Sequence, residues 1–524
     1  MFKTYPVATF LLPKRLKLAS LLFPPQPTAL STDASLSPQQ DPRQPILLAS
    51  HQAMSQTRAD SPPRPQRPMA YFPLGYKEAV QQWWASVSSR QAERNVLAFV
   101  PYLREASAES VVGSQLQDLA NCDPFGLRVW RTSMVELSGK NRALNELSIE
   151  RVGEQADDTL VMLHGYGAGL GFFYKNFEPL SRAQGWKLYA LDMLGMGNSS
   201  RPPFKIRAKD PKEKIAEAEA WFIDALEEWR KIRKIEKFTL LGHSLGGYLA
   251  VSYALKYPGR LNKLILASPV GVPEDPWAID SSMPEPQEST LANEFTQDQE
   301  SIVKGEPAQV RAPAADKKPA TVAAPPRRPI PSWLVWLWDA NVSPFSIVRM
   351  AGPLGPRFAS GWTFRRFNHL PPAEKDALHT YSYSLFRQRG SGEYALPYLL
   401  APGAYARSPL INRIQDVGRQ VLRPATDTTP AVRETGIPVV FMYGENDWMD
   451  VAGGYAAEEK LKQRRIQALL NATDDEKRRE NGSAKVVIVR KAGHNLYLDN
   501  PDEFNEVVLK EMEETRQRRL RLGE

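Results

Sequence analysis

A serine flanked by glycines directly follows a short apolar run near the middle of the chain. Residues 238–241 are apolar except for Thr239, and Gly242-His243-Ser244-Leu245-Gly246-Gly247 comes next. The G-x-S-x-G spacing is typical of a tight turn from a strand into a helix, where a side chain at either glycine would collide with neighbouring backbone. Because such a turn exposes the serine hydroxyl at the carboxyl end of the strand, the spacing predicts that Ser244 is a nucleophile.

A serine needs a base, and the base needs a carboxylate. Residues 437–443 have the β-branched and aromatic composition of a buried strand, which ends in Gly444-Glu445-Asn446-Asp447-Trp448-Met449-Asp450. A second strand is predicted over 485–489, and His494 follows it. An imidazole takes the serine proton and a carboxylate fixes its tautomer, so we expect His494 to be the base and Asp447 its partner. Asp450, three residues on, remains an alternative acid.

Chain position separates His494 from the other histidines. The others belong to glycine-rich motifs or follow no predicted strand: His164, His243, His51, His369 and His379. The resulting order of serine, acid and histidine along the chain is that of the α/β hydrolases.

A second glycine-rich loop follows a predicted strand about eighty residues before the serine. Residues 159–163 have the composition of a short buried strand, and His164-Gly165-Tyr166-Gly167-Ala168-Gly169 comes next, which resembles the HG-x loop of lipases and esterases. Such a loop can direct backbone N–H groups at a developing negative charge. We therefore expect the amides of Tyr166 and Leu245 to form an oxyanion hole. The alternative is a loop that only turns into a helix.

Strands alternate with helices around these motifs. Strands are predicted over 187–191 and 263–268, and helices over 213–235 and 248–257. This alternation favours a parallel sheet. The predicted fold class is α/β, an α/β-hydrolase fold whose mostly parallel central sheet is flanked by helices. About two hundred residues separate Ser244 from Asp447, so a helical cap is expected between the nucleophile and acid segments.

Composition divides the chain further. We expect a disordered region over 1–70, the first part of the hydrolase core over 71–272, the cap over 273–435 and the second part of the core over 436–524. Residues 285–331 are rich in Pro, Ala, Gln, Glu and Lys, which predicts a disordered insertion. The rest of the cap is aromatic, which fits either helix packing or a channel for long acyl chains; the residues are Trp333, Trp336, Trp338, Phe345, Phe358, Trp362, Phe364 and Phe367.

Several classes of site are not supported by the composition. The 524 residues contain one cysteine, Cys122, which excludes an intrachain disulfide framework. The histidines form no metal-ligand pattern, and we predict no metal and no cofactor. No motif supports nucleic-acid binding, and no apolar stretch has the length of a membrane span. The net charge of +8 could favour an anionic lipid surface. The sequence leaves the oligomeric state open.

The amino-terminal region suggests a destination. Residues 1–32 contain no acidic residue, and Lys3, Lys14, Arg15 and Lys17 alternate with apolar residues, as in a mitochondrial targeting segment. We expect a location peripheral to the inner mitochondrial membrane, with a lipid droplet or the cytoplasm as alternatives. Residues 76–97 form an amphipathic pattern with Trp83 and Trp84, which suits a membrane interface or a helix packed on the domain.

From about residue 71 onward, apart from the insertion, the chain resembles one branch of the α/β hydrolases. This branch includes fungal mitochondrial cardiolipin-specific deacylases, lysophosphatidic acid acyltransferases and animal abhydrolase-domain lysophospholipases. The motifs that carry the resemblance are Trp83-Trp84, residues 164–169, 192–202 and 242–247, Asp447-Trp448-Met449 and residues 494–501. Some members carry asparagine at the nucleophile position and act as lipase co-activators. Because this chain keeps Ser244, the resemblance implies an enzyme.

The carboxyl-terminal motif allows two chemistries. His494 and Asp499 have the H-x-x-x-x-D spacing of a catalytic pair in glycerolipid acyltransferases of another fold, although Asp499 could instead cap the helix that begins near Pro501. We expect a serine hydrolase that deacylates cardiolipin or a related anionic phospholipid through an acyl-serine. Its predicted partners are a phospholipid substrate and a membrane surface. The alternatives are an acyl-CoA-dependent lysophosphatidic acid acyltransferase and a non-catalytic lipase co-activator.

Overall fold

The computed structural model describes residues 72–85, 87–106, 123–274, 303–304, 338, 340–401, 403–429, 431–470 and 472–522. All of them belong to one compact unit, Pro68–Glu524. The predicted tail over 1–70 lies outside the described residues, as does the predicted insertion over 285–331 except for residues 303–304. Within the described residues, no helix combines the length and the apolar character needed to cross a membrane.

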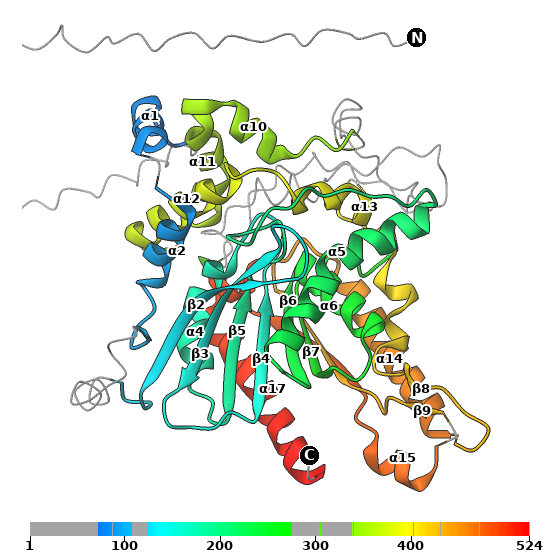
Figure 1. The fold of residues 1–524 in the computed structure, drawn as a ribbon. Helices are drawn as coiled ribbons and strands as arrows, with labels where there is room; N and C mark the ends of the chain where they lie inside the picture. The colour runs from blue at the N-terminus through cyan, green and yellow to red at the C-terminus, as the bar shows by residue number, and fades with distance from the viewer. Residues whose placement is uncertain are drawn as a thin grey trace, which may run out of the picture. The chain divides into compact units, whose positions relative to one another are not determined.

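In the described part of the chain, nine strands form one sheet in the order β1-β2-β3-β5-β4-β6-β7-β10-β11 (Figure 1). The strands from β5 to β11 are parallel, whereas β3 is antiparallel to both of its neighbours. This arrangement confirms the predicted fold class. The strand bounds are β1 Arg104–Glu105, β2 Arg128–Glu136, β3 Ala143–Arg151, β4 Asp158–Leu163, β5 Trp186–Leu191, β6 Phe238–His243, β7 Leu261–Ala267, β10 Pro438–Gly444 and β11 Ser483–Val489.

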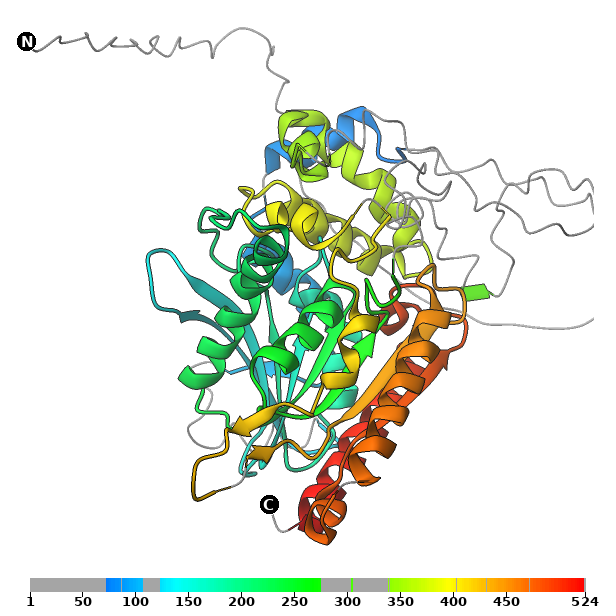
Figure 2. The same cartoon turned by 90° about the vertical axis from the view of Figure 1, so that its right-hand side faces the viewer.

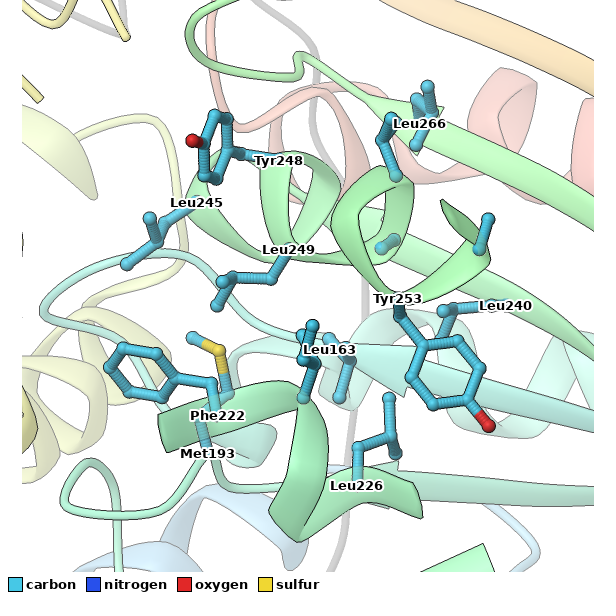
Figure 3. Packing of buried hydrophobic residues seen from close by; sticks show 14 of the residues in the cluster. Leu163, Met193, Phe222, Leu226, Leu240, Leu245, Tyr248, Leu249, Tyr253 and Leu266 are labelled. Atoms are coloured by element: carbon cyan, nitrogen blue, oxygen red, sulfur yellow. The ribbon is translucent and has the colours of Figure 1, made fainter. Parts of the chain in front are cut away.

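The central strands are apolar at successive positions because both faces of the sheet are covered. In β4, Val161 and Leu163 face one core, and Leu160 and Met162 face the other. The helices of the first core include α5 (Pro211–Ile232), α6 (Leu245–Lys256) and α14 (Val451–Leu470). Figure 3 shows side chains of α5 and α6 meeting those of the strands in this core. The second core contains residues of α2 (Ser89–Leu97), η1 (Leu170–Phe173), α4 (Tyr174–Leu180), α16 (Leu496–Asp499) and α17 (Pro501–Leu522).

Helix boundaries differ from the sequence expectation where capping residues set them. Helix α5 begins two residues before the predicted 213, because the Asp210 side chain accepts hydrogen bonds from the N–H groups of Lys212 and Glu213. The amphipathic pattern over 76–97 is not one helix. It forms α1 (Tyr76–Ala85) and α2, and the side chain of Ser88 caps the start of α2.

Part of the described region between β7 and β10, over residues 344–399, forms a cap over the carboxyl ends of the central strands (Figures 1 and 2). The helical elements described between β7 and β10 include α10 (Pro344–Met350), η2 (Gly352–Leu354), α11 (Gly355–Arg366), α12 (Pro372–Phe386), η3 (Gly392–Ala395), α13 (Leu396–Leu399), η4 (Leu410–Asn412) and η5 (Ile414–Asp416). The small antiparallel pair β8 (Val421–Arg423) and β9 (Val432–Arg433) follows them.

The loop after β5 packs tightly against the cap. Gly195 has a φ of +74°, and a Cβ there would lie 2.4 Å from the backbone nitrogen of Gly392 in the cap. Arg201 strengthens this contact by donating to Gln388 Oε1 at 2.9 Å and to the carbonyl of Arg389 at 3.2 Å. The motif over 192–202 therefore joins the cap to the sheet.

A buried polar cluster also links α2 and α12 to the core. Glu93 of α2 accepts hydrogen bonds from Asn198 Nδ2 at 2.8 Å, from Asn145 Nδ2 at 3.2 Å and from the hydroxyl of Tyr381 in α12 at 3.0 Å. Asn145 also donates to Asp192 Oδ2 at 2.8 Å. Burial and the nearby charge of Asp192 raise the pKa of Glu93 to about 8.

The raised pKa makes stability depend on pH. Between about pH 4.5 and pH 8 the folded protein retains a proton on Glu93 that the unfolded chain has lost, so stability falls as the pH rises through this window. Glu93→Gln removes the titration. We expect its free energy of unfolding, relative to the parent, to increase toward pH 8 by up to about 1.4 kcal/mol per pH unit. Urea denaturation of both proteins across this range measures the slope, and parallel curves would contradict the assignment.

Candidate active site

Ser244 occupies the sharp turn between β6 and α6. Its backbone has φ 52° and ψ −116°, which L-residues rarely adopt. A Cβ on Gly242 would lie 2.4 Å from the carbonyl oxygen of Gly246, and one on Gly246 would lie 2.7 Å from that of His164. The glycines are therefore required by backbone packing on both sides of the turn, as the sequence motif predicts. Ser244 itself is partly exposed.

The loop after β4 lies against this turn. A Cβ on Gly165 would be 3.0 Å from the Cβ of Ser244. The His164 ring fixes the loop, because Nδ1 lies 2.7 Å from the carbonyl of Gly165 and Nε2 accepts from the N–H of Met193 at 3.1 Å. Burial lowers the pKa of His164, which favours the neutral ring that this pairing needs. Sequence reasoning assigned His164 no role beyond its motif.

The two amides expected to form the oxyanion hole lie on the elements that meet at Ser244. Leu245 is the first residue of α6, where backbone N–H groups have no partner within the helix. Tyr166 directly follows Gly165, and its ring stacks on Phe345 of the cap with centroids 5.1 Å apart. This placement is compatible with two amides near the serine, and the assignment stays a prediction.

His494 and Asp447 are paired. Nδ1 of His494 lies 3.3 Å from Asp447 Oδ1, and both side chains are buried. Asp447 also accepts the N–H of Met449 at 3.0 Å and the hydroxyl of Ser268, which follows β7. These donors hold the carboxylate in place, and the Nδ1 contact leaves Nε2 of His494 as the atom able to accept a proton.

Asp450 is placed differently. Its Oδ1 accepts the N–H of Ala452 at 2.9 Å in the first turn of α14, and the residue is exposed. The structure therefore brings Asp447, and not Asp450, to His494. Ser268 has no motif of its own, and the fold alone reveals its contact with Asp447.

His243, the residue before Ser244, contacts His494. The His243 ring lies 4.8 Å from the His494 ring, and its Nε2 is 3.0 Å from the carbonyl of His494. Because a carbonyl can only accept, Nε2 of His243 carries the proton. Burial holds the pKa of His243 well below its usual value. On the other side, Trp448 lies with its ring centroid 4.5 Å from that of His494. Both neighbours restrict the position of the base.

The aspartate of the H-x-x-x-x-D motif does not pair with His494. Asp499 Oδ2 accepts the N–H of Gly493 at 2.9 Å, so it fixes the backbone just before His494. Asn500, not Asp499, accepts from the first turn of α17 through the N–H of Glu503 at 3.3 Å. This contact gives Asp499 a loop-holding role that neither sequence interpretation included.

The cap places aromatic side chains over the site. Phe345 lies between Tyr166 and Phe386, with the second pair of centroids 4.5 Å apart, and Trp362 lies 5.4 Å from Phe386. Phe364 packs on His379. Packing between rings thus accounts for Phe345, Trp362 and Phe364 of the cap. Trp333 and Trp336 lie outside the described residues. Over the described ranges, no group of three or more His, Cys, Asp and Glu side chains is arranged to hold a metal ion.

Comparisons with known proteins identify the same fold as the structure. The family model for the alpha/beta hydrolase fold matches residues 158–501. The chain is 31% identical to the 1-acylglycerol-3-phosphate O-acyltransferase of Arabidopsis thaliana, over 71% of this chain and 70% of that one. It is 31% identical to the mouse 1-acylglycerol-3-phosphate O-acyltransferase ABHD5 (72% and 83%) and 30% identical to the mouse (lyso)-N-acylphosphatidylethanolamine lipase (68% and 79%).

Solved structures give a more distant likeness. The carboxylesterase CesB of Bacillus subtilis aligns with 82% of this chain and 97% of its own, at a TM-score of 0.40 and 14% identity.

Substitution of each candidate acid, Asp447 or Asp450, tests which of the two supports His494. Asp447→Asn should lower kcat by about three to four orders of magnitude, because an amide cannot hold the imidazole in the reactive tautomer. Asp450→Asn, the matched control, should change kcat by less than about threefold, since Asp450 is exposed and contacts only its own helix start in the described residues. Ester hydrolysis by both variants measures this, and the reverse order would exclude Asp447 as the acid.

Proposed function

Because the chain belongs to the α/β-hydrolase superfamily, we propose that it is a serine hydrolase that deacylates membrane glycerophospholipids, with cardiolipin or a related anionic phospholipid as substrate. The supporting observation is the buried His494–Asp447 pair beside the strained turn that presents Ser244. The resemblance to cardiolipin deacylases supports the choice of lipid.

The proposed reaction has two steps. Nε2 of His494 takes the proton of Ser244 as Oγ attacks the ester carbonyl, and the amides of Tyr166 and Leu245 stabilise the oxyanion. The tetrahedral intermediate collapses to an acyl-serine, and His494 protonates the departing lysolipid oxygen. Water then attacks the acyl-serine by the same route and releases the fatty acid. Asp447 orients the imidazole and stabilises its charged form throughout.

Acyl transfer is the second candidate, because two of the relatives are named 1-acylglycerol-3-phosphate O-acyltransferases. In that case acyl-coenzyme A would form the acyl-serine, and the hydroxyl of lysophosphatidic acid would replace water as the acceptor. His494 could deprotonate either acceptor. The contact of Asp499 with Gly493, rather than with His494, favours this route over a separate His-Asp pair.

The reaction also needs access to a lipid surface. Among the described helices, α1 and α10 each expose large apolar side chains: in α1, Tyr76 and Trp84 are 65% and 80% exposed, and in α10, Ile347 and Met350 are 50% and 78% exposed. Both helices contact η2. We propose that this face, hereafter the α1–α10 face, docks on a membrane, and that the membrane is the inner mitochondrial membrane, as the composition of residues 1–32 suggests.

Assays with the purified protein distinguish the three candidate functions, which are phospholipid hydrolysis, acyl transfer and lipase co-activation. With labelled cardiolipin alone, release of free fatty acid that falls about a thousandfold or more in Ser244→Ala is expected. Turnover seen only when acyl-coenzyme A and lysophosphatidic acid are both present would support the transferase. No turnover with either, together with stimulation of a separate lipase, would support the co-activator and exclude both enzymatic functions.

The α1–α10 face can be tested by vesicle binding. Trp84→Ala should lower the partition coefficient onto cardiolipin-containing vesicles by about tenfold, because its apolar area would be lost from the interface. Leu470→Ala provides a matched control, since Leu470 is 76% exposed at the end of α14. Co-sedimentation measures both, and equal effects of the two substitutions would argue against a specific docking face.

A further inference from the structure

Arg366, the last residue of α11, is a buried charge without a hydrogen-bond partner in the described part of the chain. The residue is 1% exposed, and none of its three guanidinium nitrogens finds an acceptor among the described residues. Burying a guanidinium without acceptors is costly, and native proteins rarely leave such a group unsatisfied. The lack of an acceptor for the Arg366 guanidinium therefore needs a physical explanation.

A second buried arginine, Arg128, provides a comparison, because its guanidinium has protein acceptors. Arg128 is 0% exposed, and its three nitrogens contact both carboxylate oxygens of Asp123, the side chain and carbonyl of Glu178, and the hydroxyl of Ser181, at 2.7–3.0 Å. Arg128 is therefore satisfied by the protein alone. Arg366 has equal burial and none of these bonds.

Arg366 lies beside the active site. Its charge acts on His243, which precedes the nucleophile, and on Asp499, which holds the His494 loop. Two neighbours fix the end of α11 there. Phe367 contacts Phe172 with centroids 5.8 Å apart, and Nε2 of His369 lies 3.4 Å from the carbonyl of Leu498.

Asp499 does not supply the missing hydrogen bonds. Its Oδ2 accepts the N–H of Gly493, and its Oδ1 lies 3.8 Å from Nε2 of His369. Burial raises the pKa of Asp499 to about 7 in spite of the opposing charge of Arg366, so near neutral pH the carboxyl is charged only part of the time. The Arg366 guanidinium can therefore pair with an anion that stays fully charged near neutral pH.

We propose that Arg366 binds the phosphate of the glycerophospholipid substrate while the ester carbonyl is at Ser244. A guanidinium presents paired N–H donors that match two phosphate oxygens, and such charge-assisted bonds are strongest where water is excluded. The inference rests on the proposed function and adds the substrate class, because it makes the phosphate group a requirement for tight binding.

Two short-chain lipids that differ only in the phosphate test the proposal. Hydrolysis of dioctanoyl phosphatidate and of dioctanoylglycerol is measured without acyl-coenzyme A, so that no other phosphate-bearing ligand competes for the site. Arg366→Gln should lower the ratio of kcat/KM for phosphatidate to that for dioctanoylglycerol by roughly tenfold to a hundredfold, mainly through KM. Arg366→Lys should fall between the two proteins, because it keeps the charge and loses the paired donors.

Arg365→Gln is the matched control, because it removes the same charge from the preceding position of α11. It should leave the substrate ratio unchanged. An equal loss on both lipids in Arg366→Gln would mean that Arg366 acts through Asp499 or through cap packing, and would overturn the proposal. An unchanged ratio would overturn it as well.

A binding measurement keeps this inference separate from the proposed function. In the Ser244→Ala background, dioctanoyl phosphatidate should raise the melting temperature more than dioctanoylglycerol does, and the difference should disappear when Arg366→Gln is added. This result supports the phosphate site even if the parent protein shows no turnover. An equal shift with inorganic phosphate alone would contradict a lipid site, as would a difference that persists in the double variant. Circular dichroism of each variant verifies that it is folded.

Discussion

The backbone of Ser244 is held in a conformation that costs of order 1–3 kcal/mol, and the surrounding packing must supply that energy. Helix α6 supplies part of it, because Leu245, Tyr248 and Leu249 are at most 1% exposed in the core shared with α5 (Figure 3). The glycines on both sides admit the backbone of the neighbouring loops. The strained turn is therefore stable only within a completed sheet, and the chemistry at Ser244 depends on the whole fold.

Loops at the strand ends are held by buried carboxylates rather than by regular structure. Asp192 accepts the N–H groups of Leu170 and Asn198 at 2.7 Å, Asp447 accepts that of Met449, and Asp499 accepts that of Gly493. Each carboxylate satisfies backbone donors that would otherwise be buried without partners. Three loops around Ser244 and His494 are thus positioned in the same way, and one of these carboxylates, Asp447, also pairs with His494.

The sequence predicted the parts of this site that carry local signals. The glycines around Ser244 are dictated by the turn itself, and the strands before Asp447 and His494 have recognisable composition. Contacts such as Ser268 with Asp447 and His369 with the carbonyl of Leu498 could not be predicted, because they join segments far apart in the chain and involve residues with no spacing rule. The antiparallel strands β2 and β3 were also missed, since their polar positions conceal the alternation of a strand.

The choice between hydrolysis and acyl transfer is not made by the nucleophile. In the proposed mechanism an acyl-serine would react with whichever hydroxyl reaches Nε2 of His494, so exclusion of water by the cap would decide the product. Phe345 and Phe386 join the cap to the Tyr166 loop, and Trp448 shields one side of the base. A phosphate held at the end of α11 would place its own glycerol hydroxyl or ester near Ser244. Substrate and acceptor could then share one binding mode, and cap packing would decide which of the two reactions follows.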